Sequence, residues 1–133
     1  MKVASLVLAT LLCCTFCDAK MQSATYEHNG RKITASWYSE KSCKREGTSG
    51  RCADGSLFRD ENKTAASWDF AFGQKLRVTN KKTGKSVIVE ITDRGPNKKL
   101  YKKGRVLDLS KSAFASIADL REGVIEVLIE EVK

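Results

Sequence analysis

Apolar and polar residues alternate along several short runs of this chain, which is the period of a β-strand with one buried face. In residues 75–79, Leu76 and Val78 alternate with Lys75 and Arg77. The run at residues 86–92 is instead almost continuously β-branched, which is typical of a more deeply buried strand. The same criteria predict further strands at residues 32–38, 105–107 and 124–132.

Turn residues separate these runs. Residues 80–85 predict a hairpin turn in which Gly84 supplies the unrestricted φ. Gly95 and Pro96 end the β-branched run at residues 86–92. A helix is predicted from Ser110 to about residue 120, because its apolar positions share one face, namely Ala113, Phe114, Ile117 and Ala118. Residues 64–67 are predicted to form one helical turn, and residues 39–60 a long loop.

Many short strands, one helix and no internal repeat predict a small mixed β-barrel, since closure of a sheet removes its exposed edges. Two acidic residues, Asp93 and Asp108, are expected at the ends of two of its strands, each beside a structural transition. A carboxylate in that position can face a cleft while the sheet holds its backbone.

The N-terminus has the pattern of a signal peptide. Lys2 precedes an apolar run at residues 3–12, and small residues at Cys17 and Ala19 predict cleavage after Ala19. The run is too short to span a membrane. We therefore divide the chain into a signal peptide at 1–19, a flexible segment at 20–31 and one domain at 32–133. The expected location is extracellular, or periplasmic in a bacterium, with no membrane association after cleavage.

Cleavage at this point would leave two of the five cysteines, Cys43 and Cys52. An even pair in an exported chain predicts a disulfide, which would close the Gly- and Ser-rich loop between them. Two cysteines at this spacing with a single histidine, His28, make a poor zinc site, so no metal is expected. Asn62 begins a glycosylation sequon that applies if the host is eukaryotic.

The formal net charge of +8 predicts an anionic partner, namely nucleic acid, a membrane surface or an acidic cell-wall polymer. Export argues against nucleic acid, and the lysine clusters contain only Tyr101 as an interleaved aromatic residue. The alternative is a charged surface that serves only to keep a monomeric protein in solution.

Seven motifs follow one another in an order that resembles the rare lipoprotein A (RlpA) family: Thr34–Ser39, Thr64–Ala66, Phe72–Gly73, Leu76–Asn80, Gly84–Val87, Asp93–Pro96 and Leu107–Ser110. The resemblance implies a mainly β fold, the six-stranded double-psi β-barrel of expansins, barwin-like proteins and family 45 endoglucanases, here with one or two short helices. It also implies lytic transglycosylase activity on peptidoglycan strands stripped of peptides, a reaction that uses no cofactor and no metal.

The same resemblance assigns the proton donor of that reaction to Asp93. The family's Gly-Glu-x-Phe-Asp pattern stands here as residues 55–59, with Ser56 for the glutamate and Arg59 for the aspartate. Its Thr-Ala-Ala-His stands as residues 64–67, with Ser67 for the histidine. The activity implied for this chain is therefore a weak or altered one.

Each acid also has a structural interpretation. Asp108 matches the acid that expansins and family 45 endoglucanases keep, but it could instead cap the helix that follows. Asp93 could fix its turn by accepting from the Gly95 N–H or by pairing with Arg94.

Aromatic residues are candidates for stacking on sugar rings. Tyr38 and Trp68 are the better ones, whereas Trp37 shares the apolar face of its strand and is expected in the core. Arg94 is a further candidate for substrate binding.

Three functions remain open from the sequence. The first is a secreted wall-polysaccharide protein with weak or altered lytic activity, and the second is a non-catalytic protein that binds or loosens wall. The third is a protease inhibitor or defence protein that displays the loop between Cys43 and Cys52, since a covalently closed loop loses less entropy on binding.

Overall fold

The structure is a computed structural model that describes residues 25–47 and 49–133. The predicted signal peptide and the first part of the predicted flexible segment lie outside the described residues. Within the described residues, no helix is long and apolar enough to cross a membrane.

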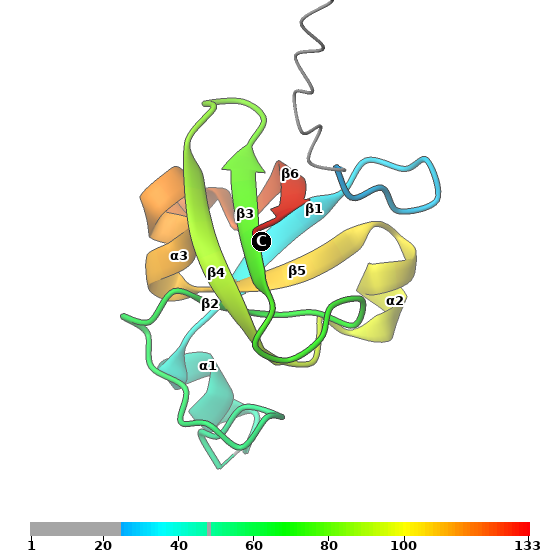
Figure 1. The fold of residues 1–133 in the computed structure, drawn as a ribbon. Helices are drawn as coiled ribbons and strands as arrows, with labels where there is room; N and C mark the ends of the chain where they lie inside the picture. Colours follow the sequence, from blue (N-terminus) through cyan, green and yellow to red (C-terminus); the bar gives the residue numbers. More distant parts are fainter. Residues whose placement is uncertain (1–24, 48) are drawn as a thin grey trace, which may run out of the picture.

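Six strands close into a mixed barrel, in the order β1-β5-β2-β4-β3-β6 (Figure 1). Their bounds are Thr34–Tyr38 for β1, Thr64–Ala66 for β2, Lys75–Asn80 for β3, Ser86–Asp93 for β4, Arg105–Ser110 for β5 and Val124–Glu131 for β6. The pairs β1–β5 and β2–β4 are parallel, and the other four pairs are antiparallel. The six-stranded, mainly β architecture predicted from the sequence is confirmed.

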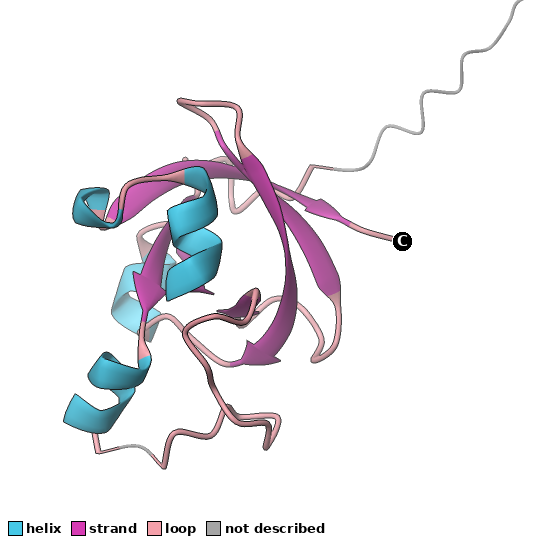
Figure 2. Cartoon of the chain, turned by 90° about the vertical axis from the view of Figure 1, so that its left-hand side faces the viewer, coloured by secondary structure: helices cyan, strands magenta, loops and turns pink. Residues whose placement is uncertain are grey.

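Apolar side chains at every second position of the strands fill the interior of the barrel. On β3, Leu76 and Val78 are fully buried, and on β6, Val127 and Ile129 are too, while their neighbours point outward. Helix α3, Lys111–Ile117, adds the buried ring of Phe114 to the same core. Figure 2 shows the helical segments to one side of the strands. The opposite wall is therefore made of strands.

Helical structure departs from the prediction in three places. Helix α1, Glu40–Arg45, lies in the segment that we expected to be a loop, and helix α2, Lys98–Lys102, was not predicted. Helix α3 ends at Ile117, and a separate 3-10 turn, η1, follows at Leu120–Glu122. Helix α1 starts because Ser39 and Ser42 form a reciprocal capping box, which satisfies two backbone N–H groups.

Residues 64–66 form strand β2 and not the predicted helical turn. β2 lies between β4 and β5, and both neighbours offer it backbone hydrogen bonds. A three-residue segment carries too little pattern of its own, so its partners in the barrel determine its conformation.

The described residues before β1 pack on the barrel, which differs from the loose segment that we predicted for them. Thr25 bridges to Glu130 on β6, and the Tyr26 N–H donates to the Ile129 carbonyl at 2.9 Å. The ring of Tyr26 lies 5.0 Å from that of Phe70. His28, counted in the loose segment, is buried.

Candidate functional site

Strand β2 brings the two candidate acids to one end of the barrel. Ala66, its last residue, pairs with Asp93 on β4 along one edge and with Asp108 on β5 along the other. Because neighbouring strands lie about 4.8 Å apart, the two acids flank a single alanine at the barrel mouth. The sequence prediction that both acids stand at strand ends holds for Asp93, which is the last residue of β4, while Asp108 lies within β5.

Two hollows of about 590 Å³ and 270 Å³ meet at this end of the barrel, beside α1. We call them together the acid cleft. Both are lined by the same five residues: Tyr38, Ser42, Glu46, Arg94 and Asp108. Only the larger hollow reaches Trp68, and only the smaller one reaches Asp93. In Figure 1, α1 lies below the barrel next to the end of β1.

Asp108 is half-buried in the cleft, and this burial is the main cause that raises the pKa of its carboxyl. A hydrogen bond from the Ser36 hydroxyl and the charge of Arg105 oppose the rise in pKa, whereas the negative charges of Glu46 and Asp93 add to it. The interpretation of Asp108 as a helix cap is wrong, because Ser110 caps α3 by accepting from the Ala113 N–H.

Asp93 fixes two loops through one carboxylate oxygen. Its Oδ1 accepts from the Ala53 N–H at 2.9 Å and from the Arg94 N–H at 2.8 Å. The turn-fixing role is therefore present, with the Arg94 backbone as donor in place of the predicted Gly95 N–H or guanidinium. Gly95 lies against the other acid: a Cβ there would be 3.5 Å from Asp108 Oδ2, at a φ of +152°.

Arg94 is braced by the barrel. Its guanidinium donates to the carbonyl oxygens of Ser67 at 2.8 Å and Phe70 at 2.6 Å, and it lies 3.9 Å from the centre of the Phe72 ring. Arg94 still lines both hollows, so a positive charge is held at the cleft wall in a fixed position.

The aromatic candidates play different roles. Trp68 is 40% exposed, and its Nε1 donates to the Pro96 carbonyl at 2.6 Å, so a fixed indole is available at the cleft rim. Tyr38 stacks on Phe58, with ring centres 4.4 Å apart, which occupies one face of its ring. The Tyr38 hydroxyl is buried without a hydrogen-bond partner among the described residues, and burial raises its pKa.

Trp37 packs against the core as predicted, and its Nε1 donates to the Leu120 carbonyl at 3.0 Å.

The three replaced family positions lie apart from the cleft lining. Ser67 is buried and accepts from the Asp69 N–H, Ser56 is exposed and bonded to Asp54, and Arg59 pairs with Glu40. None of them lines either hollow of the acid cleft. These positions therefore supply neither a carboxylate nor an imidazole to the cleft.

His28 does not replace the lost histidine. Its ring packs edge-on against Tyr101 at 4.7 Å, and its Nδ1 is 3.2 Å from the Tyr26 hydroxyl. It lines neither hollow of the acid cleft. In contrast, the structure places Glu46 in both hollows, and sequence reasoning missed it because it lies in a segment without strand or helix periodicity.

The structure contains no disulfide between Cys43 and Cys52. Cys52 is a buried thiol whose Sγ accepts from the Thr92 hydroxyl at 3.6 Å, and Cys43 lines the smaller hollow. Both sulfur atoms lie close enough to the Tyr38 hydroxyl to affect its ionisation.

Asn62, the predicted glycosylation residue, is exposed. Among the described residues, no group of three His, Cys, Asp or Glu side chains is arranged to hold a metal ion.

Residues 31–129 match the family model described as "Lytic transglycolase". Among curated proteins, the chain is 43% identical over 86 residues to a probable endolytic peptidoglycan transglycosylase RlpA of Nostoc, covering 64% of this chain and 22% of that protein. It is 34% identical over 113 residues to the endolytic peptidoglycan transglycosylase RlpA of Neisseria meningitidis, covering 85% of this chain and 42% of that protein. The chain thus spans less than half the length of these relatives.

Solved structures share the barrel. A Streptomyces papain inhibitor matches with a TM-score of 0.58 and 20% identity over 77% of this chain and 94% of that one. A mutant Clavibacter michiganensis expansin in complex with cellohexaose matches with a TM-score of 0.54 and 23% identity over 83% of this chain and 51% of that one. At these identities the likeness shows the fold alone. Because the family model matches residues 31–129, nearly the whole barrel, the chain belongs to the RlpA-like lytic transglycolase family of double-psi β-barrels.

Proposed function

We propose that this chain acts on peptidoglycan glycan strands as a weak or altered lytic transglycosylase, with Asp108 as the proton donor. The observation that carries the proposal is the pairing of Asp93 and Asp108 with one alanine at the mouth of a cleft. The named activity of the RlpA relatives supports the substrate class.

The choice between the two acids follows from their surroundings. A general acid must hold its proton near neutral pH, and burial favours the protonated form of Asp108. In Asp93, by contrast, one carboxylate oxygen accepts hydrogen bonds from the backbone N–H groups of Ala53 and Arg94. These bonds hold the loops that contain the two residues in place. We therefore assign proton donation to Asp108 and organisation of the cleft wall to Asp93, which reverses the order implied by the family motif.

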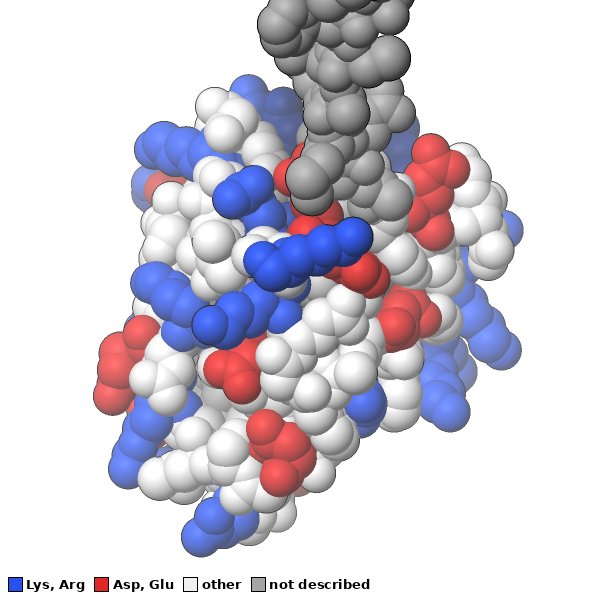
Figure 3. All heavy atoms as spheres, viewed as in Figure 1, with Lys and Arg blue, Asp and Glu red and all other residues white. Residues whose placement is uncertain are grey.

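Substrate binding is assigned to the rim. Trp68 offers an exposed ring for stacking on a sugar, and Lys98 lies 5.0 Å from that ring. Figure 3 shows Lys and Arg side chains spread over one face of the molecule with acidic side chains among them. With a net charge of +8, this supports diffuse attraction to an anionic wall polymer, which weakens with added salt.

The location and the cysteine pair complete the proposal. We place the protein outside the cytoplasmic membrane, secreted or periplasmic, after removal of residues 1–19. In that oxidising setting Cys43 and Cys52 would form the disulfide predicted from the sequence. Intact-mass analysis under non-reducing conditions, with two free thiols as the contradicting result, tests this part.

The activity is tested with glycan strands stripped of peptides and mass spectrometry of the products. Anhydro-muramyl ends indicate transglycosylation and reducing ends indicate hydrolysis. We expect Asp108→Asn to lower turnover at least about 100-fold with binding retained, because Asn cannot donate the proton. The matched control, Glu126→Gln, changes an acid outside the cleft and should leave turnover unchanged.

Two results would change the assignment. Loss of activity in Asp93→Asn with full activity in Asp108→Asn would return the proton donor to Asp93. Absence of both product types from the wild-type protein, with binding to the strands retained, would favour the second candidate, a non-catalytic wall-binding protein. The replacements at Ser56, Arg59 and Ser67 are the specific observation in favour of that candidate.

A further inference from the structure

Helix α1 carries a third carboxylate to the acid cleft. The helix is tied to the neighbouring loop by Glu40, whose N–H donates to Asp60 Oδ1 at 2.8 Å and whose carboxylate pairs with Arg59 at 3.1 Å. At its other end Glu46 is the C-cap, and its N–H donates to the Ser42 carbonyl at 3.1 Å. The first residue of α1 is therefore tied to the loop at residues 59–60, and Glu46 directly follows the last turn of the helix.

The Glu46 side chain is an exposed group that lines both hollows of the cleft. It lies close enough to Asp108 for its negative charge to raise the pKa of that carboxyl. None of the five ion pairs within the described residues uses Glu46. Within the described residues, its carboxylate is therefore not neutralised by an ion pair.

We propose that Glu46 is the general base of the cleft, accepting the proton of the attacking sugar hydroxyl while Asp108 donates to the leaving glycosidic oxygen. This inference rests on the function proposed above and adds a residue to it. Glu46 lies outside the motifs on which the family resemblance rests.

The step conserves atoms, protons and electrons. The C6 hydroxyl oxygen of the muramyl sugar forms a bond to C1, and the bond from C1 to the glycosidic oxygen breaks. The hydroxyl proton passes to the Glu46 carboxylate, and the leaving oxygen takes the proton of Asp108. Nothing is oxidised or reduced, and exchange with solvent restores both carboxyl groups.

The other candidates for the base fit less well. Asp93 has one carboxylate oxygen occupied by two backbone N–H groups, and the phenol of Tyr38 is held in its protonated form by burial. Ser56 and Ser67 carry no basic side chain and lie outside the cleft lining. Glu46 is the remaining carboxylate that lines both hollows, and its exposure leaves it open to an incoming sugar.

The test compares Glu46→Gln with a control, Glu131→Gln. Glu131 is an exposed acid at the end of β6 that lines neither hollow, so both variants lose one surface charge. Two readouts are needed: the titration of Asp108 by carbon NMR of its labelled carboxyl, and turnover on stripped glycan strands. We expect Glu46→Gln to lower the pKa of Asp108 and to reduce kcat about 100-fold with a small change in KM. Glu46→Asp should restore part of the activity, and Glu131→Gln should change neither readout.

The outcomes distinguish a failure of the role of Glu46 from a failure of the proposed function. An active wild type with equal activity in Glu46→Gln and Glu131→Gln overturns the role of Glu46 and leaves the proposed function standing. An unchanged titration of Asp108 in Glu46→Gln overturns the placement of Glu46 beside it. An inactive wild type that forms no anhydro ends removes the proposed function, and the base role with it.

Discussion

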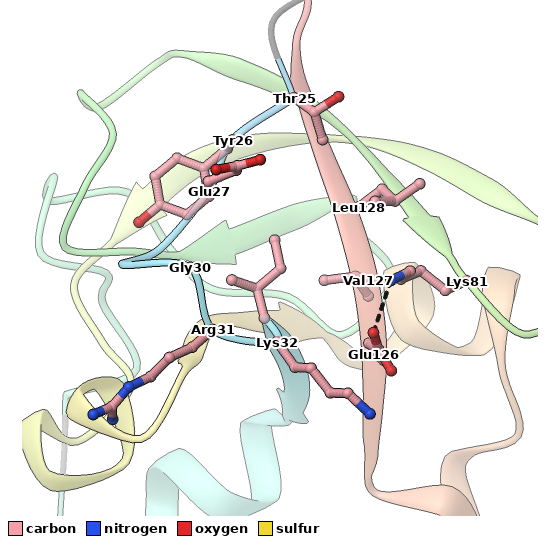
Figure 4. A pocket seen from close by; sticks show the side chains of 11 residues that line it. Thr25, Tyr26, Glu27, Gly30, Arg31, Lys32, Lys81, Glu126, Val127 and Leu128 are labelled. Atoms are coloured by element: carbon pink, nitrogen blue, oxygen red, sulfur yellow. Dashed lines mark hydrogen bonds and ion pairs between the residues drawn. The ribbon is translucent and has the colours of Figure 1, made fainter.

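Asp108 and Glu126 are two carboxylates that flank the same strand but have opposite electrostatic surroundings. Asp108 on β5 pairs with Ser36 of β1, and Glu126 on β6 pairs with Thr34 of β1. Asp108 is half-buried in the acid cleft, where burial raises its pKa. Glu126 lines a separate hollow of about 280 Å³ outside the acid cleft, which we call the second hollow (Figure 4). There the Lys81 Nζ lies 2.8 Å from the Glu126 carboxylate and lowers its pKa.

The difference shows that position on the barrel, and not residue type, determines what a carboxylate can do. In the second hollow, Glu126 is half-buried and pairs with Lys81 at 2.8 Å, and the charge of Lys32 also lowers its pKa, so its surroundings suit an ion pair near the surface. In the acid cleft, the negative charges of Glu46 and Asp93 add to the effect of burial in raising the pKa of Asp108. The positive charge of Arg105 lowers that pKa but does not outweigh burial. Of these two carboxylates, Asp108 is therefore the one whose surroundings favour the protonated form.

The largest stability effect is expected from Asp93→Ala in the acid cleft. Removal of the carboxylate leaves the Ala53 and Arg94 N–H groups without their acceptor, which should lower the free energy of unfolding by about 2 kcal/mol. Asp93→Asn keeps an acceptor oxygen and should lose clearly less. Urea titration of both variants checks this, and equal stability of Asp93→Ala and wild type would contradict it.

The pH dependence of Asp108→Asn tests the comparison directly. Because the pKa of Asp108 is raised on folding, the folded state binds more protons than the unfolded state between the two pKa values, so its contribution to stability falls as pH rises through that window. An uncharged Asn avoids this cost and can still accept from Ser36. We expect Asp108→Asn to be more stable than wild type at pH 7, with the difference absent near pH 3, below the usual Asp pKa of about 3.9.

Glu126→Gln should show the opposite sign. The lowered pKa of Glu126 contributes stability above its unfolded pKa that is lost as pH falls through the folded value, so any deficit of the Gln variant appears at neutral pH and vanishes in acid. Thermal unfolding of both variants from pH 3 to pH 7 measures the two trends. Parallel trends would contradict the comparison.

A smaller effect is expected from Tyr38→Phe. The Tyr38 hydroxyl is buried without a partner among the described residues, so its removal should raise the free energy of unfolding by about 1 kcal/mol. The matched variant is Tyr101→Phe, which removes a hydroxyl that donates to Asp69 at 2.5 Å and should be destabilising. A loss of stability in Tyr38→Phe in chemical denaturation would show that the hydroxyl is satisfied after all.

The smallest effect is expected from Lys81→Ala in the second hollow. Its ion pair with Glu126 is exposed to solvent, and such pairs contribute little to stability because water and salt screen them. The unfolding midpoint should differ slightly from wild type at low salt and not at all in 1 M NaCl. Lys85→Ala, an exposed change in the adjacent turn, is the control, and a salt-resistant loss in Lys81→Ala alone would contradict the expectation.

The barrel class and the position of Asp93 at a strand end could be predicted from the sequence alone. Strands β3, β4 and β6 carry side-chain patterns strong enough to be recognised alone, because every second or nearly every residue is apolar over five residues or more. The motifs around Asp93 and Asp108 supplied the family and two of the three carboxylates of the cleft.

The surroundings of the acids followed from contacts between segments that are distant in the sequence. β2 is a strand because β4 and β5 lie on either side of it. Ser110 caps α3, while the Asp108 carboxylate accepts from the Ser36 hydroxyl. Glu46 enters the cleft through a helix that no periodicity predicted. The physical reason is common to all three: local propensity is weak over a few residues, and the pKa of a carboxyl depends on burial and on charges that are distant in the sequence.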